Sequence, residues 1–156
     1  MTEKGRIDSR SRTIGAPADR IYDAFLSADA WLEWLPPAGM SGLMHAFDPR
    51  PGGSYRMELL YRDDDTGTGK STDTSDIVDG TFVDFMPGRR VVQSVTFASD
   101  DPAFAGEMRM IWNLTPVAGG THVTITCENV PSGILQADHH DGLDSTLRNL
   151  EAFVTR

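Results

Sequence analysis

From Gly42 to Glu128 this chain repeatedly alternates apolar with polar residues, and a period of two residues is typical of a half-buried β-strand. Tyr55–Tyr61, Met108–Leu114 and Val123–Cys127 follow this pattern, and Gly119-Gly120 joins the last two as a hairpin turn. Strands that are joined by hairpins form an antiparallel sheet. Such a sheet has an apolar face, which another part of the chain must cover.

A helical period appears near both ends of the chain. Asp19–Leu26 and Asp29–Leu35 are predicted to be two short helices, and Pro36-Pro37 must end the second. They follow a weakly alternating first strand at Arg6–Ile14. From about Gln136 to Val154, apolar residues spaced by four, three and four positions form one stripe on a long helix. We expect the apolar stripe of this helix to pack on the apolar face of the sheet, which gives an α+β fold.

Length and charge narrow the classes of function. The 156 residues contain no internal repeat, so one domain over residues 1–156 is expected. The formal net charge of −9 repels phosphate groups and anionic lipids, which argues against nucleic-acid binding and against membrane docking. No stretch approaches the ~20 apolar residues that cross a bilayer, and the start of the chain lacks the apolar segment of a signal peptide. With a single cysteine and hence no internal disulfide, the cytoplasm is the expected location.

The segment Asp63–Asp76 contains almost no apolar residues and is predicted to be a long hairpin loop. Its Gly67–Ser71 part resembles a phosphate-binding loop, but that pattern requires a glycine where Asp64 stands. A calcium-binding loop would require a glutamate where Thr74 stands. We therefore expect no nucleotide, metal or other cofactor at this segment.

The run Asp138-His139-His140-Asp141 is the most conspicuous polar cluster. Adjacent helical residues point about 100° apart, whereas zinc ligands on a helix lie three or four positions apart. Acidic residues near a helix start are stabilising in themselves, so no metal site is expected here. Tracing the apolar stripe back three residues from Leu143 reaches His140. We expect His140 either to face a cavity or to be a hydrogen-bonded core histidine.

Several short motifs, most of them turns, follow one another along the chain. The most specific is Phe47–Gly53, which contains the pattern D-x-R-x-G-G. The others are Ala16-Pro17, Trp34 with Pro36, Gly80, Met86–Arg90, Gly119-Gly120-Thr121 and Gly142. Together they resemble the START-like, or SRPBCC, superfamily, and within it the group named after the C-terminal domain of the activator of Hsp90 ATPase homologue. The resemblance implies a helix-grip fold, in which a curved antiparallel sheet of six to seven strands wraps around the last helix.

The same resemblance implies a cavity between the sheet and the last helix. Where the group usually has Gly-Trp, this chain has Gly142-Leu143, so a cavity at that level would be larger or differently shaped. Apolar clefts of this kind are common ligand sites. The inward-facing positions supply these candidate cavity residues: Trp31, Trp34, Met40, Phe47, Tyr55, Met57, Leu59, Tyr61, Phe85, Phe97, Met108, Met110, Trp112, Cys127, His140, Leu143 and Leu147. Cores and pockets use the same residue types, so the sequence leaves open which of these only fill the core.

Three functions follow from these features. The first is binding or carriage of a small hydrophobic or amphipathic molecule. The second is an enzyme of cyclase, dehydratase or hydrolase type that uses His140, Tyr55, Tyr61 or Glu128 as acid or base, although no suitable pair is evident and no catalytic residue is assigned. The third, which the resemblance implies, is a co-chaperone-like or stress-response protein with a chaperone or a second copy as its partner. Cys127 is expected to be a small buried hydrophobe.

Overall fold

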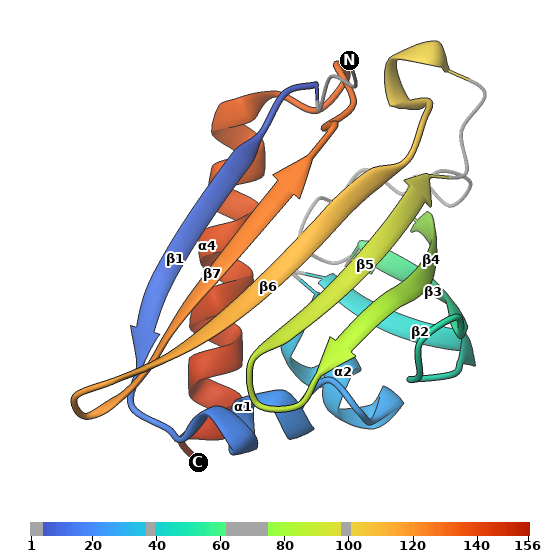
Figure 1. Cartoon of the computed structure of the whole chain (residues 1–156). Coiled ribbons are helices and arrows are strands. Elements are labelled where there is room, and N and C mark those ends of the chain that lie inside the picture. The colour runs from blue at the N-terminus through green and yellow to red at the C-terminus, as the bar shows by residue number, and fades with distance from the viewer. Residues whose placement is uncertain (1–4, 37–39, 62–74, 98–100) are drawn as a thin grey trace.

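The computed structural model describes residues 5–36, 40–61, 75–97 and 101–156 (Figure 1). The elements follow in this order: β1 (Asp8–Ile14), α1 (Ala18–Asp23), α2 (Ala28–Trp34), β2 (Met40–Phe47), β3 (Ser54–Tyr61), β4 (Ser75–Met86), β5 (Arg90–Phe97), the 3-10 helix η1 (Pro102–Phe104), β6 (Met108–Val117), β7 (Gly120–Glu128) and α4 (Gln136–Val154). This order confirms the predicted helix-grip α+β fold, with two short helices after the first strand.

The seven strands form one sheet in the order β1-β7-β6-β5-β4-β3-β2, and every neighbouring pair is antiparallel. The first two strands thus lie at opposite edges, and α1 and α2 carry the chain between them. Register shifts between Met44 and Ala46 and between Phe82 and Asp84 mark irregular pairing, which bends strands locally. Figure 1 shows β2 and β3 running at a steep angle to β1 and β7, so the sheet curves.

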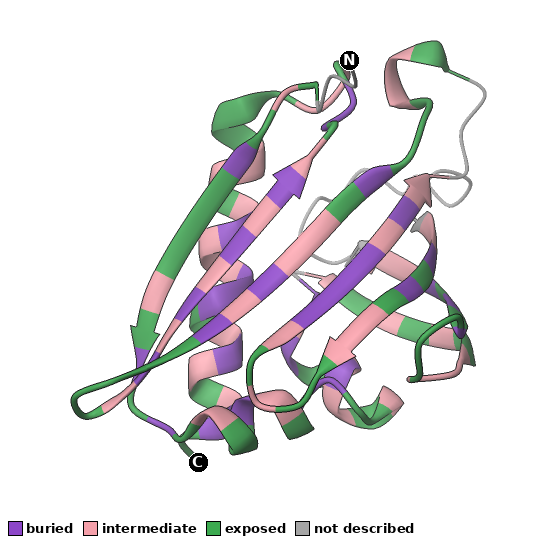
Figure 2. Ribbon diagram, viewed as in Figure 1, coloured by how far each residue is buried: buried purple, intermediate pink, exposed green. Residues whose placement is uncertain are grey.

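The predicted stripe on α4 is buried against the sheet and the short helices. Leu143, Leu147, Leu150 and Val154 all belong to the main apolar core, and Figure 2 shows the buried positions alternating along the central strands. The helix packs beside β1 and against α2. No helix in the described part of the chain is long and apolar enough to cross a membrane.

Aromatic side chains fill the interior next to α1 and α2. The rings of Phe25, Trp34 and Trp112 meet edge to face, with centroids 5.0–5.5 Å apart. The indole N–H groups of Trp31 and Trp34 donate to the carbonyls of Phe25 and Ala24, at 3.1 and 3.0 Å. Because these polar atoms are satisfied, Trp31 and Trp34 can be fully buried. The sheet is therefore tightly filled at this end.

The turn in Phe47–Gly53 contains an exposed ion pair. The Arg50 Nε donates to both carboxylate oxygens of Asp48, each at 2.9 Å. Gly52 has a positive φ of +85°, and a Cβ on Gly53 would lie 2.0 Å from the Asp48 carbonyl oxygen. Both positions therefore require glycine.

Element boundaries differ from the prediction by a few residues. The first helix ends at Asp23 and not at Leu26, because a new helix with its own N-cap follows directly: Ser27 accepts a hydrogen bond from the Ala30 N–H at 3.3 Å. The first strand begins at Asp8. The predicted loop Asp63–Asp76 falls mostly on residues 62–74, which lie outside the described residues, and its last two residues belong to β4.

Candidate functional site

A pocket of about 460 Å³ lies between the first half of α4 and the inner side of β3 to β6. It borders the tightly packed aromatic interior beside α1 and α2, and Trp31 of α2 forms part of its wall. The lining consists of Trp31, Leu35, Met40, Tyr55, Met57, Leu59, Val78, Gln93, Val95, Phe97, Met108, Met110, Ile134, Asp138, His139, Gly142, Leu143 and Thr146. Most of these side chains are apolar, and only a few polar groups interrupt them.

About half of the residues that the sequence nominated lie in this lining. They are Trp31, Met40, Tyr55, Met57, Leu59, Phe97, Met108, Met110 and Leu143. Trp34, Trp112, Cys127 and Leu147 are instead wholly buried in the packed core. Phe47 and Phe85 pack against that core from partly buried positions. The Tyr61 side chain lies outside the described residues. His140 is not in the lining, and the residues in the packed core lie where the short helices occupy the interior.

On α4 the structure places His139 in the lining, and His140 does not line it. The pocket-facing residues Asp138, His139, Gly142, Leu143 and Thr146 are spaced by one, three, one and three positions. Tracing back from Leu143 by four residues, not three, therefore reaches the pocket. Steps of three and of four residues along a helix both lead back to nearly the same face. The sequence period alone therefore does not decide whether His139 or His140 faces the pocket.

A buried chain of polar side chains crosses the wall of the pocket. The Trp112 Nε1 donates to the Gln93 Oε1 at 2.7 Å, and the Gln93 Nε2 donates to the Tyr55 hydroxyl at 3.2 Å. Burial raises the pKa of Tyr55, so its hydroxyl keeps a proton that it can donate to a ligand. Sequence reasoning missed Gln93, although a lone amide in the apolar run of β5 was a usable signal.

The ring of Tyr55 has its place because its neighbour is a glycine. Tyr55 pairs with Gly80 across β3 and β4, and a Cβ at Gly80 would lie only 2.1 Å from the Tyr55 Cζ. The missing side chain lets the ring lie close against the backbone of β4. Gly80 therefore positions the only tyrosine among the described lining residues.

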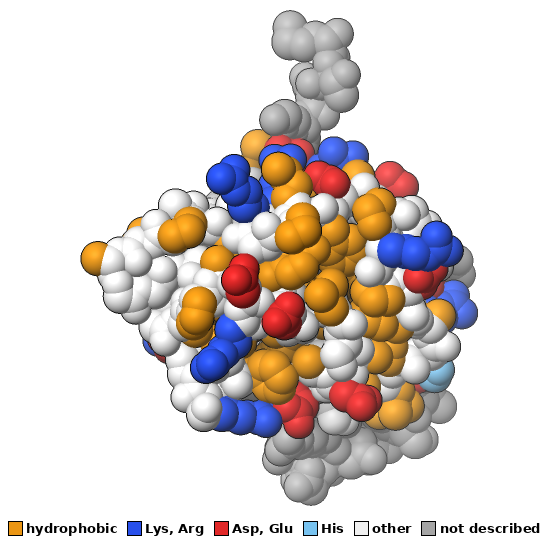
Figure 3. Space-filling view, turned by 60° about the horizontal axis from the view of Figure 1, so that its bottom comes forward, with side chains coloured by type: hydrophobic (Ala, Val, Ile, Leu, Met, Phe, Trp, Pro, Cys, Tyr) orange, Lys and Arg blue, Asp and Glu red, His pale blue; other side chains and the backbone are white. Residues whose placement is uncertain are grey.

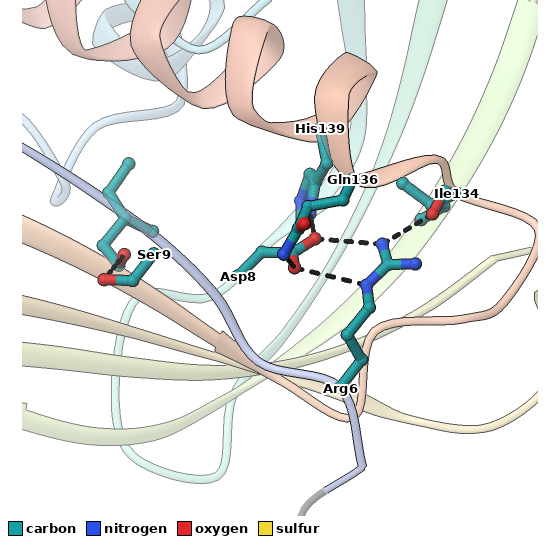
Figure 4. A network of polar contacts seen from close by, with 7 residues as sticks. Arg6, Asp8, Ser9, Ile134, Gln136 and His139 are labelled. Atoms are coloured by element: carbon teal, nitrogen blue, oxygen red, sulfur yellow. Dashed lines mark hydrogen bonds and ion pairs between the residues drawn. The ribbon is translucent and has the colours of Figure 1, made fainter.

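The second polar feature joins the start of the chain to the start of α4 (Figure 4). The carboxylate of Asp8, whose side chain is fully buried, accepts hydrogen bonds from Arg6, Gln136 and His139. The shortest, from the His139 Nδ1, is 2.7 Å. Burial raises the pKa of Asp8, but the hydrogen bonds from Arg6, His139 and Gln136 outweigh it and lower this pKa to about 2. Asp8 is therefore ionised at neutral pH.

This network was not predicted, because Asp8 lies in a polar first strand whose pattern gives no sign of burial. Its contact with His139 spans 131 residues of sequence. Chemically, the arrangement orients an imidazole whose other nitrogen, Nε2, can accept a hydrogen bond or a proton from a molecule in the pocket.

Cys127 and the acidic residues near α4 do not form a further reactive site. Burial, together with the charge of Asp8, raises the pKa of the Cys127 thiol to about 12, so the thiol stays protonated. Within residues 5–36, 40–61, 75–97 and 101–156, no group of three or more His, Cys, Asp or Glu side chains is arranged to hold a metal ion.

A second hollow, of about 390 Å³, lies where α1 meets the end of α4. It is lined by Arg20, Asp23, Ala24, Ala30, Phe153, Val154 and Arg156. Figure 3 shows apolar side chains reaching the surface at this end, with charged side chains among them. Leu26 and Met86 are among the exposed large apolar residues of the protein.

The sequence and the fold are both similar to those of known proteins. Residues 15–155 match the family described as Activator of Hsp90 ATPase homolog 1-like protein. Protein CV1439 from Chromobacterium violaceum is 29% identical, with a TM-score of 0.83 over 96% of this chain and 97% of its own. An AHSA1-like protein from Aeromonas hydrophila is 16% identical, with a TM-score of 0.72 over 96% and 92% of the two chains, which shows a shared fold. No curated protein matches. The chain therefore belongs to the family of Activator of Hsp90 ATPase homolog 1-like proteins, within the START-like, or SRPBCC, superfamily.

Proposed function

We propose that the protein binds a small, largely apolar molecule in the pocket between α4 and the sheet. The observation that carries this proposal is the lining itself, in which apolar side chains surround a few polar groups, among them Tyr55 with Gln93, and His139, which Asp8 binds from behind. Small-molecule sites typically combine a mostly apolar wall with a few convergent polar groups, in a volume of roughly 300–1,000 Å³.

The methionines of the lining support an adaptable site. Met40, Met57, Met108 and Met110 come from three different strands and all line the pocket. Their unbranched thioether side chains can change rotamer to follow the shape of a guest, and their sulfur atoms make favourable contacts with aromatic rings. A wall of this composition suits a flat, unsaturated ligand.

Gly142 keeps one wall of the pocket open. It lies inside α4, where glycine costs about 1 kcal/mol relative to alanine. A Cβ added there would meet no atom within 4 Å, so neither backbone geometry nor close packing explains the glycine. The open space next to Gly142 belongs to the pocket, and a bound molecule would occupy it.

Titration with a neutral fluorescent probe, N-phenyl-1-naphthylamine, tests the proposal. We expect saturable binding with one probe per chain, while near-ultraviolet circular dichroism stays that of the folded protein. Gly142→Trp should fill the pocket from α4 and weaken binding at least about tenfold, since the indole would occupy the space that the probe needs.

Ala152→Trp is the matched control for this variant. Ala152 is an exposed residue on the same helix and is not among the lining residues, so probe binding should stay at the wild-type level. Equal losses in both variants, or no binding to the folded wild type, would refute the pocket as a ligand site.

A chaperone partner is the second candidate, and the name of the family suggests it. Exposed apolar residues lie beside α1, among them Leu26, which follows this helix, and Met86, which lines a hollow together with Ala18 and Asp19. The test is whether the purified protein raises the ATPase rate of a purified Hsp90 chaperone. If a Leu26→Asp, Met86→Asp double variant stimulates as well as the wild type, this surface is not the one used.

A further inference from the structure

We propose that His139, oriented by Asp8, is the polar end of the pocket and selects a neutral ligand that carries a hydroxyl group, such as a phenol or an alcohol. This inference rests on the proposed binding function and adds the chemical class of the ligand to it. It follows from three features of the site, which are the hydrogen bonds of Asp8, the ring nitrogen that they leave unused, and the charges nearby.

The carboxylate of Asp8 holds the imidazole in one orientation. Asp8 comes from β1, whereas Gln136 and His139 come from the first turn of α4, and all three meet beside Arg6 (Figure 4). The Arg6 guanidinium also donates to the Ile134 carbonyl, which connects it to the segment before α4. The His139 side chain is 13% exposed, and its residue lines the pocket. The ring is therefore fixed on one side and open to the pocket on the other.

The ionised Asp8 also decides which ring nitrogen carries the proton. A carboxylate can only accept hydrogen bonds, so the His139 Nδ1 at 2.7 Å must be the donor. In the neutral ring Nε2 is then the acceptor. This atom makes no hydrogen bond with any residue in the described part of the chain. A ligand hydroxyl is the group that would satisfy it.

The charges around this end of the pocket disfavour an anionic ligand. Asp138 lies in the lining and Asp8 lies directly behind His139, whereas the described lining residues include no lysine or arginine. Arg6, which lies at this end, is already paired with Asp8. At this end a ligand carboxylate would meet two like charges, and no lysine or arginine of the described lining would pair with it, so an alcohol or phenol of the same skeleton should bind more tightly.

Three naphthalene ligands separate these possibilities: 2-naphthol, 2-methoxynaphthalene and 2-naphthoate. Their dissociation constants are measured at neutral pH by calorimetry and by displacement of N-phenyl-1-naphthylamine. For the wild type we expect 2-naphthol to bind about 3- to 10-fold more tightly than 2-methoxynaphthalene, the effect of one hydrogen bond, and 2-naphthoate to bind most weakly.

His139→Asn is the decisive variant. Its amide nitrogen can take the place of Nδ1 and still donate to Asp8, but nothing replaces Nε2. We expect the thermal stability to change little and the preference for 2-naphthol over 2-methoxynaphthalene to disappear. If that preference persists, His139 is only a structural partner of Asp8 and the inference is wrong.

Asp8→Asn tests the role of the tautomer. An amide at this position can donate to Nδ1, which would place the ring proton on Nε2 and turn it into a donor. The discrimination against 2-naphthoate should then shrink relative to the wild type. If the wild type binds 2-naphthol and 2-methoxynaphthalene with the same ratio as His139→Asn, hydroxyl selection is refuted while the pocket remains a binding site. If it binds none of the three ligands, both proposals fall together.

Discussion

The ionised Asp8 should make the stability of the protein depend on pH in a way that can be calculated. The pKa of Asp8 falls from the ordinary 3.8 to about 2 in the folded protein. A full shift of this size corresponds to roughly 2.5 kcal/mol, since each pKa unit is worth about 1.36 kcal/mol. Solvent reaches the side chain of Arg6, which is 32% exposed, and screens part of this interaction, so we expect about 1–2 kcal/mol.

The sign of the effect follows from the direction of the shift. Because the folded-state pKa is depressed, the stabilisation is fully present above the unfolded-state pKa of 3.8 and is lost as the pH falls towards 2. About half of the contribution should be gone by pH 3. Asp8→Asn removes the titrating group, so the variant should lack this part of the pH dependence.

Urea unfolding of the wild type and of Asp8→Asn, followed by tryptophan fluorescence between pH 6 and pH 3, measures the effect. The signal suits the purpose because Trp31, Trp34 and Trp112 are all fully buried. The difference in unfolding free energy between the two proteins should shrink by about 0.5–1 kcal/mol over this range. Asp79→Asn, which removes an exposed ion pair with Arg56, is the control and should show a smaller change. A constant difference between wild type and Asp8→Asn would refute the assigned hydrogen-bond network.

Three further outcomes are expected. Gly142→Ala should raise the free energy of unfolding by about 1 kcal/mol, or roughly 2–4 °C in Tm, because its Cβ meets no atom within 4 Å; a lower Tm in calorimetry would contradict this. Gly80→Ala should cost about 1–3 kcal/mol in urea unfolding, because its Cβ would lie 2.1 Å from the Tyr55 Cζ and displace the ring; wild-type stability would show that the ring moves freely. Cys127 should not react with Ellman's reagent at pH 8 until urea unfolds the protein, because the thiol is fully buried and its pKa is raised to about 12; rapid reaction of the folded protein would mean that β7 opens locally.

Much of this fold could be predicted from local patterns. The alternation in 55–61, 108–114 and 123–127 marks which side chains of a strand share a face, and that information is present in any six or seven consecutive residues. The stripe from Leu143 to Val154 is likewise a property of one helix. Turn motifs such as Asp48–Gly53 specify their own backbone, because the glycines are needed whatever surrounds them. Strands, helices and the faces that they bury were therefore predictable.

The candidate site was predictable only in part, because a pocket is a space that several distant segments leave unfilled. Trp34 and Trp112 carry the same inward-facing pattern as Met57 and Met110. The interior around the two tryptophans is filled, whereas the two methionines line the pocket. No local pattern contains that difference.

The chain by itself thus determined its elements, their apolar faces and its family, because period, turn chemistry and motif order are local properties of the sequence. The folded arrangement decided that His139, and not His140, reaches the pocket, because the buried Asp8 of β1 binds the first turn of α4 from 131 residues away. It also decided that the pocket has a charged, hydrogen-bonded end, since burying Asp8 requires partners from the other end of the chain.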